Sequence, residues 1–228
     1  MRNIFVYLTF ALLTQLAMAQ ATIDRVVAVV NKKVITQSDW DVQERFEALV
    51  NGRAPESVQF STISLDRLVD QQLMREQIEY VRFDPVSAEQ TAAQVAAVRT
   101  QIAPALNDKQ WQDLLTRYSL TEEEFAGRVT AQFEVMRFVD LRFRPSVHVE
   151  TESVENYYKQ SLVPELMKTG SQENALPSLK EVEPKIRTIL QEQKLNEMLR
   201  MWLTSLRSQG RIKRLIPEAK PLSSSASD

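Results

Sequence analysis

Side chains that could perform acid–base or nucleophilic chemistry are few in this sequence. It contains no cysteine and a single histidine, His148, so it offers no thiol nucleophile and at most one histidine ligand for zinc. Three consecutive glutamates, Glu122 to Glu124, could form an acidic site, but they follow Thr121 at an expected helix start, where negative charge is favourable. We therefore expect His148 to be a surface or packing residue, and we expect no catalytic residue, no cofactor and no metal site.

The remaining functional candidates are methionines and aromatic residues on predicted helix faces. Methionine is flexible enough to fit irregular partners, so methionines with aromatic residues suit a groove that binds many different polypeptides. The same residue types at helical spacing are also typical of a hydrophobic core, and that alternative stays open for each of them. The candidate binding residues are Met74, Trp111, Phe133, Met136, Met198, Met201 and Trp202.

The first residues predict export by a cleavable signal peptide. Arg2 precedes an apolar run from Ile4 to Leu16, and Ala17-Met18-Ala19 matches the small-x-small pattern of a cleavage site. The run is short for a membrane span and is interrupted by polar residues, although an uncleaved anchor is the alternative. We expect cleavage after Ala19 and a periplasmic protein that is not stably inserted in a membrane.

The composition of the chain excludes several classes of partner and favours helices. Its 28 basic and 30 acidic residues give a net charge of -2, without the clustered basic excess that nucleic acid binding requires. Only four glycines are present, which argues against a phosphate-binding loop. Without cysteine, an exported protein of this kind must rely on packing and not on disulfide bonds.

Hydrophobic spacing predicts a mostly α-helical fold that begins with one β-hairpin. The valine-rich segment from Ile23 to Thr36 contains Asn31 at a turn position, which suits a tight connection. Ser38 is the expected N-cap of the next helix, and Gly52 is the expected residue just beyond its end. Further helices are expected over 62–83, from Ser87 to Pro104, over 109–118, from Thr121 to Pro145, over 151–160 and over 178–208, and a strand is expected over 212–216.

Four stretches together resemble the chaperone module of the SurA family, periplasmic folding factors for outer-membrane proteins. The most specific is VVAVVNKKVITQSD at 26–39, in which a valine-rich hairpin leads directly into a capped helix. The other three are LDRLVDQQL at 65–73, LTEEEF at 120–125 and WLTSLR at 202–207. The resemblance implies that the helix from Leu179 to Ser208 folds back onto the amino-terminal helices, and that the strand at 212–216 pairs with the hairpin.

The resemblance also implies a division of the chain. In the SurA family, parvulin-type prolyl isomerase domains lie between the counterparts of the helix at 151–160 and of the final helix. Here only a linker of low order is expected between these helices, and it is too short for such a domain. The expected parts are a signal peptide (1–19), a helical chaperone domain (20–160), a linker (161–177), a helix and strand that complete the domain (178–216), and a disordered tail (217–228).

The function that the resemblance implies is an ATP-independent chaperone without enzymatic activity. It would bind unfolded outer-membrane or exported proteins in an apolar crevice between helices. Two alternatives remain: a prolyl isomerase with residual activity, and a module that binds one dedicated envelope partner. The sequence does not predict the oligomeric state or the identity of the clients.

Overall fold

The computed structural model describes residues 24–81, 84, 86–168 and 176–216. The expected signal peptide at 1–19 and the expected tail at 217–228 lie outside these residues. The described helices are α1 (Gln37–Val50), α2 (Thr62–Tyr80), α3 (Ala88–Ile102), α4 (Asp108–Arg117), α5 (Glu122–Phe143), α6 (Thr151–Tyr157), α7 (Val163–Lys168) and α8 (Leu179–Gln209), with short 3-10 turns at Pro55–Ser57 and Arg144–Ser146. The predicted mostly helical fold with a small sheet is confirmed.

A three-stranded antiparallel sheet joins segments from the two ends of the described chain. Its strands are β1 (Val26–Val30), β2 (Lys33–Thr36) and β3 (Ile212–Arg214), in the order β2-β1-β3. Asn31 turns the hairpin with a φ of 54°, a left-handed conformation that asparagine tolerates better than most residues. The backbone amide of Asn31 also donates to the carbonyl oxygen of Arg211 at 2.8 Å. The pairing of the last strand with the hairpin is therefore confirmed.

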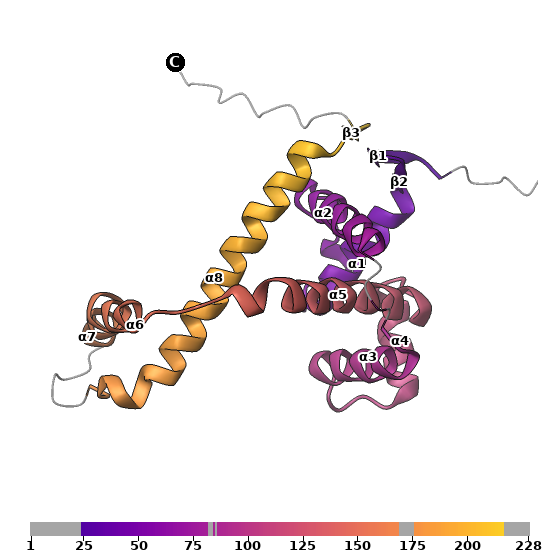
Figure 1. Cartoon of the computed structure of the whole chain (residues 1–228). Helices are drawn as coiled ribbons and strands as arrows, with labels where there is room; N and C mark the ends of the chain where they lie inside the picture. The colour runs from indigo at the N-terminus through magenta and orange to yellow at the C-terminus, as the bar shows by residue number, and fades with distance from the viewer. Residues whose placement is uncertain (1–23, 82–83, 85, 169–175, 217–228) are drawn as a thin grey trace, which may run out of the picture.

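The two longest helices, α5 and α8, cross near the middle of α8 (Figure 1). The sheet, α1 and α2 lie beside the carboxyl-terminal half of α8, whereas α3 and α4 pack near the amino-terminal half of α5 (Figure 1). The short helices α6 and α7 lie beside the amino-terminal half of α8. As a result, α8 connects two regions that are far apart in the molecule.

Buried side chains form three clusters along this framework. The first lies between the sheet, α1, α2 and the end of α8, and includes Trp40, Leu73 and Leu206. The second joins α1, α4 and α5 around Phe46 and Phe125, and the third lies where α5 meets α8. Val135, Leu199 and Trp202 are partly buried against both the first and the third cluster, so these two clusters adjoin where α5 meets α8.

Helix caps account for most of the element boundaries. Ser87, Thr121 and Ser178 cap α3, α5 and α8, as predicted, and all three form capping boxes, which the sequence predicted for Thr121. The prediction for α1 is wrong, because Thr36 caps this helix and the Asp39 side chain accepts from the Thr36 amide in return at 3.0 Å. Ser38 lies inside the helix, and its backbone amide donates to Asp24 at 3.1 Å.

The prediction of a linker of low order at 161–177 is also wrong for residues 161–168, which are helical. A π-helical turn at Tyr158–Leu162 continues α6, and α7 follows directly. The hydroxyl of Tyr158 donates to the carbonyl oxygen of Pro177 at 2.8 Å, which ties this helical segment to the start of α8. Residues 169–175 lie outside the described residues.

Polar contacts fasten the end of α8 to α2. Nε of Arg207 donates to Oδ1 of Asp70 at 2.6 Å, and its Nη2 donates to the backbone oxygen of Asp66 at 3.1 Å. The hydrogen bond to Asp70 raises the pKa of Arg207, and burial partly opposes this effect. Arg214 of β3 pairs with the Asp66 carboxylate. These contacts confirm that the last helix folds back onto the amino-terminal helices.

Candidate functional site

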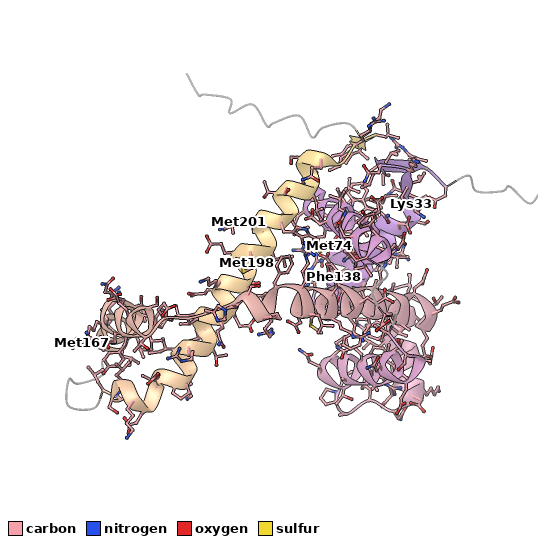
Figure 2. All side chains as sticks on the ribbon, viewed as in Figure 1. Lys33, Met74, Phe138, Met167, Met198 and Met201 are labelled. Carbon is pink, nitrogen blue, oxygen red and sulfur yellow. The ribbon has the colours of Figure 1, made fainter. Side chains whose placement is uncertain are left out.

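An open groove of 390 Å³ lies where α2, α5 and α8 meet. Figure 2 shows Met74 and Phe138 near this junction, with Met198 on α8 close by. The apolar lining comes from all three helices, and three of its side chains, Met74, Val139 and Leu195, are buried. The apolar residues are Met74, Val135, Met136, Val139, Leu195 and Leu199, and the polar ones are Gln71, Gln132, Asp140, Arg144, Glu192 and Asn196.

Helical spacing explains why these side chains share one groove. On α5, Val135 and Val139 are four residues apart and therefore lie on the same face of the helix. Leu195 and Leu199 have the same spacing on α8. Because α5 and α8 cross, the two stripes converge only at the crossing, and α2 completes the wall.

Three of the six polar residues of the groove are amides, which both donate and accept hydrogen bonds. Gln71, Gln132 and Asn196 each carry a side-chain carbonyl and an NH₂ group. An extended polypeptide presents the same two groups along its backbone. A chain with its apolar side chains on the groove floor could therefore satisfy its backbone groups at the rim.

Arg144, one of the groove residues, forms two ion pairs. Arg144 follows α5 and contacts Asp140 with its Nη2 at 2.7 Å and Glu192 of α8 with its Nη1 at 2.8 Å. The hydrogen bonds that Arg144 donates to Glu192 and, to a smaller extent, to Asp140 raise the pKa of Arg144. All three side chains are almost half exposed, so the contribution to stability is small. Only the pair with Glu192 joins the end of α5 to α8, because Asp140 lies on α5 itself.

Two of the seven residues proposed from the sequence line this groove. Met74 is 7% exposed and forms part of the floor, whereas Met136 is 50% exposed and stands at the opening. Met136 is therefore the proposed residue that a bound chain would contact most directly.

Two further proposed residues pack directly behind the groove. Met198 and Trp202 are partly buried against the third core cluster, which shares Val139 and Leu195 with the groove lining. The Trp202 ring lies 5.7 Å from Phe138 and 5.4 Å from Phe143, measured between ring centroids. Both residues support the groove floor without lining it.

The other three proposed residues lie elsewhere. Trp111 is 1% exposed in the second core cluster, with its ring 5.0 Å from that of Phe125. Phe133 is half-buried on α5 and is not among the groove residues. Met201 is 58% exposed on α8 and does not line the groove either, and Figure 2 shows it on the upper half of that helix.

The sequence analysis missed the aliphatic and amide residues of the groove. Val135 and Val139 continue the apolar spacing of α5, and that spacing was the signal that could have identified them. No comparable signal was present for Gln71, Gln132 or Asn196, because glutamine and asparagine are ordinary residues on a solvated helix face.

The single histidine of the sequence, His148, lies on the surface. His148 is exposed beside α8, and its backbone oxygen accepts from Lys194 at 3.1 Å. Within the described ranges, no group of three or more histidine or acidic side chains is placed to hold a metal ion. In that same part of the chain, no helix combines the length and the apolar character that crossing a bilayer requires.

Comparisons with known proteins support the fold. No family model and no curated protein matches the chain. A solved structure from Campylobacter jejuni is similar to 85% of this chain and 100% of its own, with 10% identity and a TM-score of 0.53. That structure comes from work describing the virulence factor PEB4 and the periplasmic protein Cj1289 as structurally related SurA-like chaperones. At this identity the likeness shows a shared fold: the chain is similar in fold to a SurA-like chaperone.

Proposed function

We propose that this protein is an ATP-independent chaperone that holds unfolded exported polypeptides in the groove between α2, α5 and α8. The observation that carries the proposal is the groove itself, which combines apolar side chains, half of them buried, with amide side chains that are partly or fully exposed. The SurA-like fold supports the same role. We include outer-membrane proteins among the clients and the periplasm as the location, on the basis of the signal-peptide pattern and the resemblance in sequence.

The groove has the properties that a reversible holding chaperone needs. Met74 and Met136 provide unbranched side chains that adjust to different apolar groups. The amide residues recognise a backbone without requiring a particular client sequence. Both features favour binding to many unfolded chains over binding to one folded partner.

The expected affinity is weak, as release of a client requires. Burying roughly 300 Å² of apolar client surface contributes about 7 kcal/mol at ~25 cal/mol per Å². Loss of translational and rotational freedom, and ordering of the client, cost several kcal/mol of this amount. The difference corresponds to a complex that forms and dissociates readily and that needs no nucleotide to release its client.

The test is suppression of aggregation by the chain from Gln20 onward. An unfolded porin is diluted from urea, and light scattering is recorded with and without a several-fold molar excess of the protein. We expect the protein to lower the scattering. Equal scattering in both samples would contradict the proposal.

A matched pair of methionine variants assigns the effect to the groove. Met136→Glu places a charge at the groove opening, whereas Met201→Glu places the same charge on an exposed part of α8 outside the groove. We expect Met136→Glu to lose most of the suppression and Met201→Glu to retain it. Equal losses in the two variants would show that a general apolar surface, and not this groove, binds the porin.

A further inference from the structure

Two arginines, Arg75 of α2 and Arg128 of α5, line two further hollows next to the groove. One hollow has a volume of 350 Å³ and the other 110 Å³, and Asp39 lines both together with the arginines. The rest of the larger hollow is mixed: Val42, Gly127 and Ala131 give it a small apolar part, and Ser38 and Glu124 also line it. The two guanidinium groups therefore face a space that no described side chain fills.

The guanidinium of Arg128 is poorly satisfied for its degree of burial. Its side chain is 18% exposed, and its Nη2 donates to the backbone oxygen of Asp39 at 2.8 Å. The nearest carboxylate oxygen, Oδ1 of Asp39, lies at 3.8 Å. Burial lowers the pKa of Arg128, and the positive charge of Arg75 lowers it further, whereas the charges of Asp39 and Glu124 oppose these effects only in part. An arginine has five N–H donors, so this arrangement leaves several for another acceptor.

The carboxylates around the hollow are already engaged as helix caps. Oδ2 of Asp39 accepts from the amide and the hydroxyl of Thr36, both at 3.0 Å. Oε2 of Glu124 accepts from the amide and the hydroxyl of Thr121, at 2.7 and 2.9 Å. Arg75 makes no hydrogen bond or ion pair within the described ranges. An added anion would complete the coordination of both guanidinium groups.

The hollows continue the groove along α5 and α2. On α5, Arg128 and Ala131 line the larger hollow, and the next residue, Gln132, lines the groove. Arg128 and Gln132 are four residues apart and so lie on the same helix face. On α2, Gln71 lines both the groove and the smaller hollow. A polypeptide in the groove could therefore extend along this seam to the arginines.

We propose that Arg75 and Arg128 bind the C-terminal carboxylate of a polypeptide whose preceding residues lie in the groove. This inference rests on the proposed function. A guanidinium fork matches the two oxygens of a carboxylate. The last side chain of the polypeptide would lie against Val42 and Ala131. A Cβ built on Gly127 meets no atom within 4 Å, so this part of the hollow has room for that side chain.

The test compares two forms of one fluorescein-labelled octapeptide of apolar and amide residues that ends in leucine. One form has a free C-terminal carboxylate and the other a C-terminal amide. Fluorescence anisotropy with the chain from Gln20 onward should show about tenfold tighter binding of the acid. Equal affinity of the two forms would overturn this inference while leaving the groove proposal intact, and no binding of either form would overturn both.

Variants of the protein test whether the preference for the free carboxylate depends on the hollow between Arg75 and Arg128. Arg75→Gln should bring the affinity for the acid down to that for the amide, as should Gly127→Leu, which fills the hollow. Arg200→Gln is the matched control, because Arg200 is an exposed arginine on α8 outside both hollows, and it should preserve the tenfold preference. A preference that persists in Arg75→Gln would overturn the inference. An amidated peptide with an internal glutamate that binds as tightly as the acid would overturn the assignment to a chain end.

Discussion

Arg207 at the end of α8 donates from Nε to Oδ1 of Asp70 on α2 at 2.6 Å, although 137 positions separate the two residues in the chain. The antiparallel pairing of β3 with β1 also joins the carboxyl-terminal part of the chain to the amino-terminal part. Side-chain bonds between α8 and α2 and backbone bonds between β3 and β1 therefore hold the same two parts of the chain together. Because α2 and α8 are both walls of the groove, the width of the groove depends on this junction.

Removing the Asp70 carboxylate should destabilise the protein by about 1–2 kcal/mol. The Asp70 and Arg207 side chains are 24% and 31% exposed, and a hydrogen bond between charged groups at such a site contributes this amount. Urea unfolding of Asp70→Ala measures the loss. Asp113→Ala is the control, because Asp113 is exposed on α4 far from this junction. Equal stabilities of the two variants would show that the Arg207–Asp70 contact adds nothing to the packing and strand pairing that hold α8.

Replacing Gly127 and Gly210 by alanine should change the stability of the protein in opposite directions. A Cβ on Gly127 meets nothing within 4 Å, and the residue lies inside α5, so Gly127→Ala should stabilise the protein by about 0.5–1 kcal/mol. A Cβ on Gly210 would lie 3.0 Å from Cδ2 of Leu73 and 3.1 Å from the backbone oxygen of Leu206. Gly210→Ala should therefore destabilise the protein by about 1–3 kcal/mol. Thermal unfolding measures both changes. Stabilisation by Gly210→Ala would contradict the close packing around Gly210, and destabilisation by Gly127→Ala would contradict the open space at Gly127.

Trp111 and Met136 should separate stability from binding. Trp111 is 1% exposed, so Trp111→Leu should cost about 2–4 kcal/mol of unfolding free energy and leave the affinity for a groove peptide unchanged. Met136 is 50% exposed, so Met136→Glu should change stability by less than about 0.5 kcal/mol but weaken peptide binding. Urea unfolding and fluorescence anisotropy measure the two quantities. Weaker peptide binding by a folded Trp111→Leu variant would place a binding surface near α4.

Local signals in the sequence were sufficient for most elements of the fold. Asn31 marked the hairpin turn, and Ser87, Thr121 and Ser178 marked helix starts, because each depends only on neighbouring residues. The cap of α1 was misassigned because Thr36 and Ser38 are both good N-caps two residues apart. The reciprocal bond between Asp39 and Thr36 decides in favour of Thr36, with aspartate in the place where glutamate is usual.

The candidate site was harder to predict from the sequence, because it depends on how the helices cross. Met136 and Trp111 are both large apolar residues on amphipathic helices, and spacing alone cannot tell which faces a core and which faces solvent. The helical segment after α6 was missed for a related reason. Pro164 suggested an irregular segment, but it closely follows the π-helical turn, where the regular ladder of α-helical hydrogen bonds is already interrupted.

The start of α8 should lose stability as the pH falls below the ordinary range of glutamate. Oε2 of Glu181 accepts from the amide and the hydroxyl of Ser178 at 2.7 and 2.8 Å, and these bonds lower its pKa below 4.5. As the pH falls, Glu181 takes up a proton in the unfolded chain before it does so in the folded chain. The stabilisation that Glu181 provides is therefore complete above pH 4.5 and is lost as the pH falls through its lower pKa in the folded chain. Hydrogen exchange along the first turns of α8 should therefore accelerate on acidification. Glu181→Gln keeps an acceptor but does not titrate, so its exchange in this helix should change less with pH. An identical acceleration in the variant and the original protein would assign the effect to other carboxylates.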